Sequence, residues 1–457
     1  MDTKKYVSLP GKFSIGFGIF GQALLTGLIT SYISYFGTDI LLVSSVALGN
    51  IMLFSKLFDG VTDIGMGFLI DKTNSKAGKA RPWIFRSIIP FALFSVLLFA
   101  APLDMSDGVK LAWVFIFYNL HALAYTALAI AMNTLNIRLS RNPKEINSLS
   151  TVLIFGTILG NVVINAAAVG ALTALSGTPE PYTQGGYLKF ATILAVVCAI
   201  GGLCTYFLTR ELSDAEVQQG PGEKTPALEG LKSLVKNKYW LIQVANNFFI
   251  YLGLNARLAA MIYFGIYVLG NPELIAFLVI ADNVPSLLCM PLALGLCNKF
   301  GKRKVSLIGL CGTMIGFAIM FLNVHNFPLL IVGLIIRGIC FAPIQGAGNA
   351  FIVDSATYGE WKTGVKAEGM AFSAVSFAQK VSAGIANSLV LWGLALVGYV
   401  ANSPTQPDSA IAGIIFMYIG VTFVCTIGQI IVFSLYDLDS KIDGVRAELA
   451  QRNGTNN

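Results

Sequence analysis

The sequence predicts an all-α membrane protein with twelve transmembrane helices in two six-helix halves. Apolar residues make up 55% of the 457 residues and charged residues only 12%, and the mean hydropathy is +0.70. A soluble chain of this length would aggregate with so much apolar surface. Two further observations, the lengths of the apolar segments and the distribution of basic residues, fix the number of helices and their orientation.

The apolar residues fall in segments that are long enough to span a membrane. A helix needs about 20 predominantly apolar residues to cross the hydrocarbon core of a bilayer. Charge clusters and Gly or Pro residues divide the chain into twelve such segments. The expected spans are 13–36, 44–70, 84–102, 110–137, 149–174, 187–209, 239–269, 273–298, 305–323, 328–352, 369–399 and 410–436.

The basic residues support this number of spans, because cytoplasmic loops are enriched in Lys and Arg. With the N-terminus inside, only Lys110 and Lys189 of the 31 Lys and Arg residues fall in loops on the outer side. Four more lie within spans: Lys56, Arg257, Arg337 and Lys380. We therefore expect a multi-pass protein of the cell membrane with both termini in the cytoplasm. The net charge of +7 reflects this topology and does not indicate a nucleic-acid partner.

A polar segment divides the spans six and six. Residues 211–237 include the stretch QQGPGEKTP at 218–226, which is typical of a linker. The predicted organisation is a first half over 1–210, a cytoplasmic linker over 211–237, a second half over 238–437 and a cytoplasmic tail over 438–457. Two six-helix repeats joined in this way are typical of the major facilitator architecture, in which the halves rock about a central site.

Two carboxylates lie inside the second span. Asp59 and Asp63 are four residues apart, on one face of a helix, with Thr62 between them. One acid at the centre of a membrane helix costs about 2.5 to 3.5 kcal/mol, so two acids need a functional explanation. The oxygens of these three residues, together with the Thr126 hydroxyl of the fourth span, predict a site that binds sodium or protons. The alternative is that Lys56 pairs with Asp59 while Asp63 faces the lipid headgroups.

Other polar residues within the spans predict a substrate cavity. A polar stripe in a membrane helix must face protein or water. In the first half, Gln22 lies on the first span, and Tyr125 and Asn133 share one face of the fourth.

The second half offers cationic and amide donors at Arg257, Arg337, Gln345 and Lys380. We expect these donors to bind substrate. The alternatives are that Arg257 pairs with Asp282 and that Arg337 snorkels to the cytoplasmic rim.

Two motifs resemble those of a known family. The acids at 59 and 63 are followed by GFLIDKT at 67–73 and GKARPW at 78–83, and the stretch DSATYGEWKTG at 354–364 comes after the tenth span. Over its whole length the chain resembles the glycoside-pentoside-hexuronide:cation symporters, the melibiose permease-like family of the major facilitator superfamily. The resemblance implies that a sugar or glycoside is carried inward with sodium or a proton by alternating access.

The resemblance also implies roles for individual residues. The family's cation-site acids correspond to Asp59 and Asp63, its Tyr-Thr pair on the fourth helix to Tyr125 and Thr126, and its membrane lysine to Lys380. The cytoplasmic loops around Asp71, Arg81, Asp354 and Glu360 are expected to form salt bridges that lock and release an inner gate.

The chain departs from the family at the sugar site. Two acids that hold galactosides in the family correspond to Ala23 and Ala129, an arginine to Leu153 and a tryptophan to Gln345. The loss of these acids, together with the three membrane cations of the second half, fits an anionic substrate such as a hexuronide. A hydrophobic aglycone would also suit the alanines.

The predicted function is secondary active transport, specifically cation-coupled symport of a sugar or glycoside by a monomer in the lipid bilayer. Two alternatives stay open: a lysolipid or amphiphile transporter of the same fold, and a sugar sensor that does not transport. An enzyme is not expected, because the sequence has no nucleophile with a base and no phosphate-binding loop. No cofactor, and no metal beyond the coupling cation, is expected.

Overall fold

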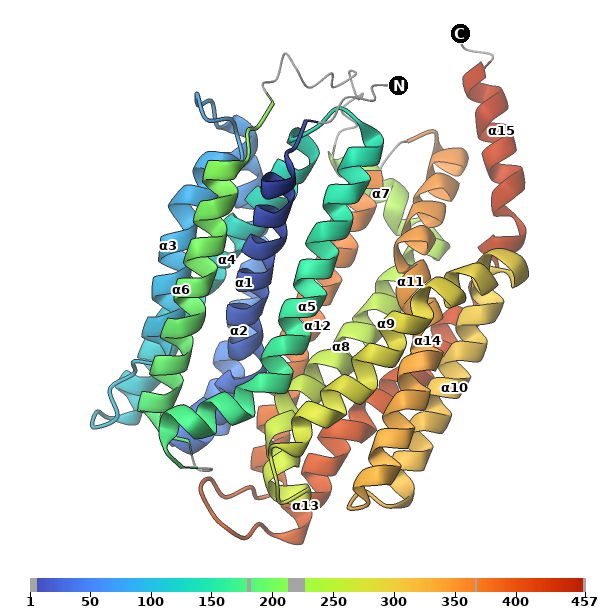
Figure 1. The fold of residues 1–457 in the computed structure, drawn as a ribbon. Coiled ribbons are helices and arrows are strands. Elements are labelled where there is room, and N and C mark those ends of the chain that lie inside the picture. Colours follow the sequence, from blue (N-terminus) through green and yellow to red (C-terminus); the bar gives the residue numbers. More distant parts are fainter. Residues whose placement is uncertain (1–5, 179–181, 213–226, 366–367, 455–457) are drawn as a thin grey trace. The chain divides into compact units, whose positions relative to one another are not determined.

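The structure is a computed structural model that describes residues 6–178, 182–212, 227–365 and 368–454 (Figure 1). Within these ranges every regular element is a helix. The predicted all-α class is therefore confirmed.

Six long helices make up the first half of the chain. They are α1 (Leu9–Tyr35) with a π-helical continuation η1 (Phe36–Ile40), α2 (Ser45–Lys72), α3 (Arg81–Leu98), α4 (Asp107–Arg138), α5 (Pro143–Ser176) and α6 (Gln184–Leu208).

The second half begins with the short helix α7 (Ala227–Val235). It continues with α8 (Lys238–Tyr263) and η2 (Phe264–Val268), α9 (Leu274–Phe300), α10 (Lys302–Leu322), α11 (Phe327–Thr363) and α12 (Glu368–Leu396). It ends with α13 (Asp408–Ile415), η3 (Phe416–Gly420), α14 (Val421–Ser434), η4 (Leu438–Ser440) and α15 (Ile442–Gly454).

The helices form two compact units. The first unit contains α1 to α6 and residues Asn387–Ala410, which include the end of α12. The second contains α7 to α11, the part of α12 up to Ala386, and the chain from Ile411 onward. Within the first unit α1 packs against α5 and α6, and α4 packs against α2 and α3; within the second, α11 packs against α9 and α10, and α8 against α14 (Figure 1).

Side-chain caps explain where several helices begin. The first backbone N–H groups of a helix have no partner inside it, and Ser, Thr or Asn oxygens accept from them. The Ser8 hydroxyl accepts from Gly11 N at 3.2 Å, and Thr183 Oγ1 accepts from Gly186 N at 3.1 Å. Asn237 Oδ1 accepts from Tyr239 N at 3.1 Å at the start of α8. These caps set the first residues of α1, α6 and α8.

Ten of the described helical segments are long and apolar enough to cross a membrane. The other two predicted spans correspond to α2 and α12, which have 28 and 29 residues. Both are longer than the roughly 20 residues that a span needs. They are also the helices that carry Lys56, Asp59, Asp63 and Lys380 within their length.

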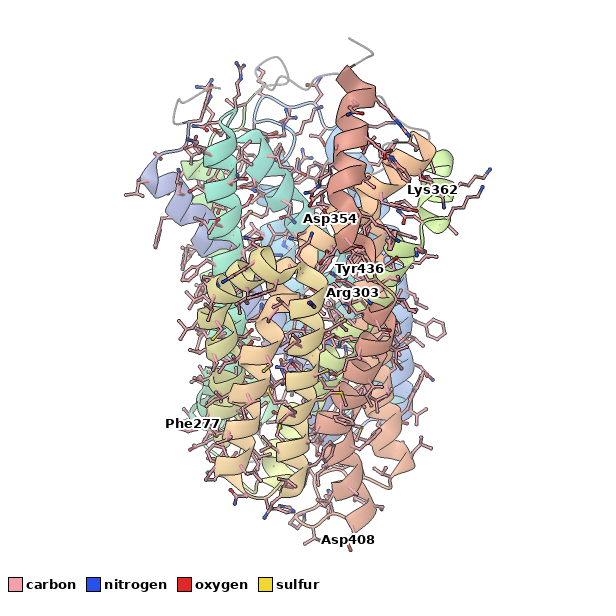
Figure 2. All side chains as sticks on the ribbon, turned by 90° about the vertical axis from the view of Figure 1, so that its right-hand side faces the viewer. Phe277, Arg303, Asp354, Lys362, Asp408 and Tyr436 are labelled. Carbon is pink, nitrogen blue, oxygen red and sulfur yellow. The ribbon has the colours of Figure 1, made fainter. Side chains whose placement is uncertain are left out.

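Two short helices occupy segments that the sequence predicts as linker and tail. Helix α7 lies within 211–237, and α15 lies within 438–457. Ile442 and Val445 of α15 join a buried cluster with Phe351 of α11 and Tyr436. In Figure 2, Asp354 and Tyr436 lie above Arg303, whereas Phe277 lies below it.

Candidate functional site

The predicted cation site lies where α4 packs against α2. Thr126 Oγ1 donates a hydrogen bond to Asp63 Oδ1 at 2.9 Å, so a hydroxyl of one helix binds an acid of the other. Asp59, one turn earlier on α2, is buried with 5% exposure. The Thr62 hydroxyl donates to the backbone oxygen of Asp59 at 3.0 Å. The Thr62 hydroxyl proton is therefore used in a hydrogen bond within α2, and the lone pairs of its oxygen can still serve as cation ligands.

Lys56 is the basic neighbour of this site. Its Nζ lies 3.0 Å from Asp59 Oδ2 and 5.6 Å from the centre of the Tyr118 ring. The ion pair that the sequence offered as an alternative is therefore present in the structure. Asp63 is half-buried and accepts the hydrogen bond from Thr126. An ammonium at Asp59 occupies one of the places that a coupling cation would take.

A pocket of about 290 Å³ in the first unit is lined by residues of α1, α4 and α5. Gln22 of α1 and Tyr125 and Asn133 of α4 all line it, as the sequence predicts for a shared polar face. The Gln22 side chain is buried, and its Oε1 has no hydrogen-bond partner within the part of the chain that the structure describes. Ala129 and Leu153 line the same pocket, so the positions that depart from the family pattern lie beside the predicted polar residues.

Three charged residues meet inside the second unit. Asp282 of α9 binds Arg257 of α8 through Oδ2 and Arg337 of α11 through Oδ1. Exposure is 5% for Asp282 and 7% for each arginine. The structure therefore contains the Arg257–Asp282 ion pair that the sequence offered as an alternative. Arg337 does not snorkel to a rim, because it is buried and shares the same carboxylate.

This cluster, Arg257–Asp282–Arg337, lines a cavity of about 270 Å³. Gln345 also lines the cavity and accepts a hydrogen bond from Ser286 Oγ at 2.9 Å. The structure thus brings three of the four predicted donors of the second half together. Lys380 is half-buried on α12 and is not among the described residues that line the cavity.

Two of the four predicted gate residues, Arg81 and Asp354, take part in polar networks, one in each unit. In the first unit, Arg81 donates through Nη2 to the Tyr206 backbone oxygen at 2.6 Å. Glu211 accepts from the backbone N–H groups of Lys79 and Ala80, both at 2.9 Å, and from Arg138 Nε at 2.5 Å. A carboxylate 130 residues away in the chain thus satisfies the N-terminal donors of α3.

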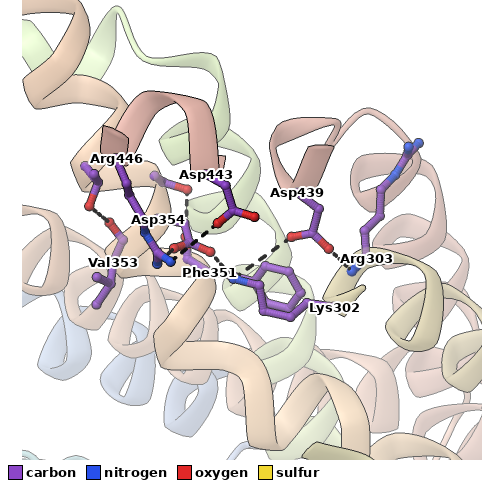
Figure 3. A network of polar contacts seen from close by, with 10 residues as sticks. Lys302, Arg303, Phe351, Val353, Asp354, Asp439, Asp443 and Arg446 are labelled. Carbon is purple, nitrogen blue, oxygen red and sulfur yellow. Dashed lines mark hydrogen bonds and ion pairs between the residues drawn. The ribbon is translucent and has the colours of Figure 1, made fainter. Parts of the chain in front are cut away.

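In the second unit, Asp354 is buried and binds Lys302 of α10 and Arg446 of α15, the latter at 2.6 Å (Figure 3). The same figure shows Asp439 accepting from the backbone N–H of Arg303 at 2.6 Å. Glu360 lies half-buried in the last turn of α11. The side chain of Asp71 lies outside the described residues.

Sequence reasoning did not select several residues of these sites. Asp282 and Lys56 entered only as partners in alternatives, and Glu211, Arg138 and Arg446 did not enter as site residues. The sequence could have indicated one further residue, Gln429, because it is a lone amide in an apolar span. In the structure Gln429 lines the cavity of the second unit. Such a residue must face protein or water in a membrane helix.

These features define a multi-pass membrane transporter of the major facilitator class. Residues 14–440 match the family described as MFS/sugar transport protein. The chain belongs to this family.

Its curated relatives match over most of their length. It is 30% identical to the isoprimeverose transporter of Lactiplantibacillus pentosus over 99% of this chain and 94% of that protein. It is 27% identical to the putative glycoside/cation symporter YagG of Escherichia coli (strain K12) over 91% and 89%. A glucuronide carrier protein homolog of the same organism is 28% identical over 82% and 81%.

A solved structure shows the same fold. The crystal structure of a D-xylose-proton symporter superposes with a TM-score of 0.65 over 92% of this chain and 96% of that one, at 16% identity.

Proposed function

We propose that this protein carries a sugar or glycoside into the cell by symport with sodium or protons. The observation that carries the proposal is the hydrogen bond from Thr126 to Asp63 beside the buried Asp59, because it brings oxygen ligands of two helices together. Hard cations are held by such carboxylate and hydroxyl oxygens. The relatives named for isoprimeverose transport and for glycoside/cation symport support the same substrate class and the same coupling.

The proposed cation site consists of Asp59, Thr62, Asp63 and Thr126. Substrate binds residues of each half: Gln22, Tyr125 and Asn133 in the first, and Arg257, Arg337, Gln345 and Lys380 in the second. A hexuronide is the anionic candidate, because two alanines stand where the family has sugar-binding acids. The name of the glucuronide carrier homolog supports this candidate.

Transport proceeds by alternating access of the halves 1–210 and 238–437, joined by the linker 211–237, with 438–457 as the tail. The cation binds first and favours the outward-open state that accepts the substrate. Linkage then requires each ligand to raise the affinity for the other by the same factor, typically about 1 to 3 kcal/mol. The networks around Arg81 and Asp354, with Asp71 and Glu360, form the inner gate. The protein works as a monomer in the cell membrane with both termini in the cytoplasm.

The test is cation-driven accumulation in proteoliposomes. Asp59→Asn and Asp63→Asn should abolish concentrative uptake while leaving the purified chain folded. Thr126→Val should weaken coupling, and Thr126→Ser, which keeps the hydroxyl, should restore it. Undiminished coupled accumulation in both acid variants would overturn the proposed site.

A further inference from the structure

The first unit carries an apolar groove of about 700 Å³ between α1 and α5. Apolar residues make up most of its lining, among them Phe13 and Phe17 of α1 and Phe155 and Leu159 of α5. Phe13 is 74% exposed and Phe155 58% exposed. Both helices are long and apolar enough to cross a membrane, so lipid chains, and not water, contact such side chains.

The groove is separate from the 290 Å³ pocket of the proposed substrate site. On α5, Thr151 and Phe155 line the groove, whereas Leu153 and Thr157 line the pocket. Each residue of the second pair comes two positions after one of the first pair. Two positions correspond to about 200° of rotation around a helix, so the groove and the pocket lie on opposite sides of α5.

Close packing of α1 against α5 forms the floor of the groove (Figure 1). A Cβ on Gly156 would lie 2.7 Å from the backbone oxygen of Gly16. Three aromatic rings of α1 line the groove beside this contact. The ring centres of Phe13 and Phe17 are 6.3 Å apart and those of Phe17 and Phe20 are 6.5 Å apart, and both pairs are stacked. The groove is therefore preformed, which lowers the entropic cost of binding a flexible chain.

Basic residues surround the end of the groove at which both helices begin. Lys12 lines the groove, and its Nζ lies 3.2 Å from Oε1 of Glu145, a buried acid at the start of α5. Arg141 and Lys144 are exposed, and Lys144 lies one turn before the groove residue Ser148 on the same face of α5. Glu145 is the only acid in the first two turns of α1 and α5 or in the loop before α5. Two positive charges therefore remain in excess.

An anionic phospholipid combines the two features that this site requires. Its acyl chain is apolar and fits the groove. Its phosphate lies at the membrane surface, where both helices begin and where each Lys or Arg adds to the attraction for anionic lipids. An ammonium has three donors, so Lys12 can contact a phosphate and keep its ion pair with Glu145.

We propose that the groove between α1 and α5 binds an acyl chain of one anionic phospholipid, whose phosphate contacts Lys12 and Lys144. A zwitterionic lipid with the same chains fills the groove but gains less from the excess positive charge. A soluble phosphate gains from the charge but buries no apolar chain. The inference requires only that α1 and α5 span the membrane, and it is independent of the sugar and of the coupling cation.

The experiment measures lipid binding to the full-length chain, purified in detergent and freed of native lipid. Dioleoylphosphatidylglycerol supplies the chain and the negative charge, dioleoylphosphatidylcholine the chain without net charge, and glycerol 3-phosphate the phosphate alone. Native mass spectrometry counts the molecules bound during a titration, and thermal stabilisation ranks their affinities. We expect one phosphatidylglycerol to bind at least about tenfold more tightly than phosphatidylcholine, because two excess charges attract it. Glycerol 3-phosphate should not bind at the same concentrations.

Variants test whether the groove is the site. Thr151→Trp fills the groove and should remove the tight phosphatidylglycerol site. Thr192→Trp on α6 is the matched control and should keep it. Both threonines are exposed, and their hydroxyls donate to the backbone oxygen four residues earlier, at 2.9 Å for Thr151 and 2.7 Å for Thr192.

A second pair of variants tests the charge. Lys12→Gln should lower the preference for phosphatidylglycerol severalfold, and Lys189→Gln, which removes an exposed ammonium from α6, should leave it unchanged. If Lys12→Gln does not fold because Glu145 loses its basic partner, Thr151→Trp still decides the inference, since it changes an exposed residue.

Three results would overturn the inference. They are equal affinity for the two lipids, binding of glycerol 3-phosphate as tight as that of phosphatidylglycerol, and undiminished tight binding in folded Thr151→Trp. The measurements use neither sugar nor an ion gradient. Their failure would therefore leave the proposed symport intact, and a failure of the symport would leave the lipid site intact.

Discussion

Replacing Lys56 by Met should tighten binding of the coupling cation about tenfold. In the structure the Lys56 ammonium lies 3.0 Å from Asp59 Oδ2, in a place that the cation would have to share. At an effective dielectric constant of 20, two unit charges at this distance attract by about 5 kcal/mol. The lysine side chain is 25% exposed, so solvent screening and the cost of desolvation offset most of that attraction. A net competition of about 1.5 kcal/mol remains, which corresponds to the factor of ten.

The assay first identifies whether sodium or protons drive uptake. It then measures the concentration of that cation at half-maximal uptake in proteoliposomes. Lys441→Met is the matched control, because Lys441 forms a comparable one-turn pair with Asp437 at 2.5 Å, outside the predicted spans of the first half. The control should leave the cation dependence unchanged. An unchanged or weaker apparent affinity in folded Lys56→Met would show that the ammonium does not compete at Asp59.

Three further substitutions test networks outside the two binding sites. Asp354→Asn should weaken the attachment of α15 by about 1 to 3 kcal/mol, because Arg446 loses its buried carboxylate partner. Hydrogen exchange of residues 442–449 should then become faster without global unfolding. Unchanged protection of these residues would contradict the prediction. Gly78→Ala should lower the melting temperature by several degrees, since Gly78 has φ +102° and a Cβ would overlap the Glu211 side chain. An unchanged melting temperature would contradict this prediction. Tyr399→Phe should destabilise the first unit by about 1 kcal/mol, because its hydroxyl donates to the buried Asp39 at 2.7 Å; equal stability would show that the bond contributes nothing.

Local sequence patterns predict the helices and part of the first-unit site. Apolar segment lengths indicate the spans, and the four-residue spacing of Asp59 and Asp63 places them on one face of α2. The predicted approach of Thr126 to these acids corresponds to the 2.9 Å hydrogen bond to Asp63. Cation binding itself stays a prediction, because it depends on coordination geometry that residue spacing does not determine.

Contacts between distant helices could not be predicted from such patterns. Arg337 and Asp282 are 55 residues apart, and they meet because α11 packs tightly on α9 at Gly338. The Glu211 carboxylate reaches the start of α3 across 131 residues. Helix α15 is a polar segment that would be marginal in isolation, and it is held by Asp354 and an apolar contact with Phe351. In each case tertiary packing, and not local propensity, decides the partner.

Opposite charges at the two proposed binding sites predict electroneutral transport. The predicted span 44–70 carries two carboxylates and one ammonium, whereas the second-unit cavity is lined by two guanidinium groups and one carboxylate. One cation and one singly charged sugar would therefore cross together without net charge.

Moving one net charge across 100 mV changes the free energy by about 2.3 kcal/mol, so a potential would strongly drive the symport of a neutral sugar. For D-glucuronate, a cation gradient alone should drive uptake, and an inside-negative potential imposed with valinomycin and K⁺ should add nothing. Accumulation driven by the potential alone would refute the one-to-one pairing of charges, because some net positive charge would then have to enter with each sugar.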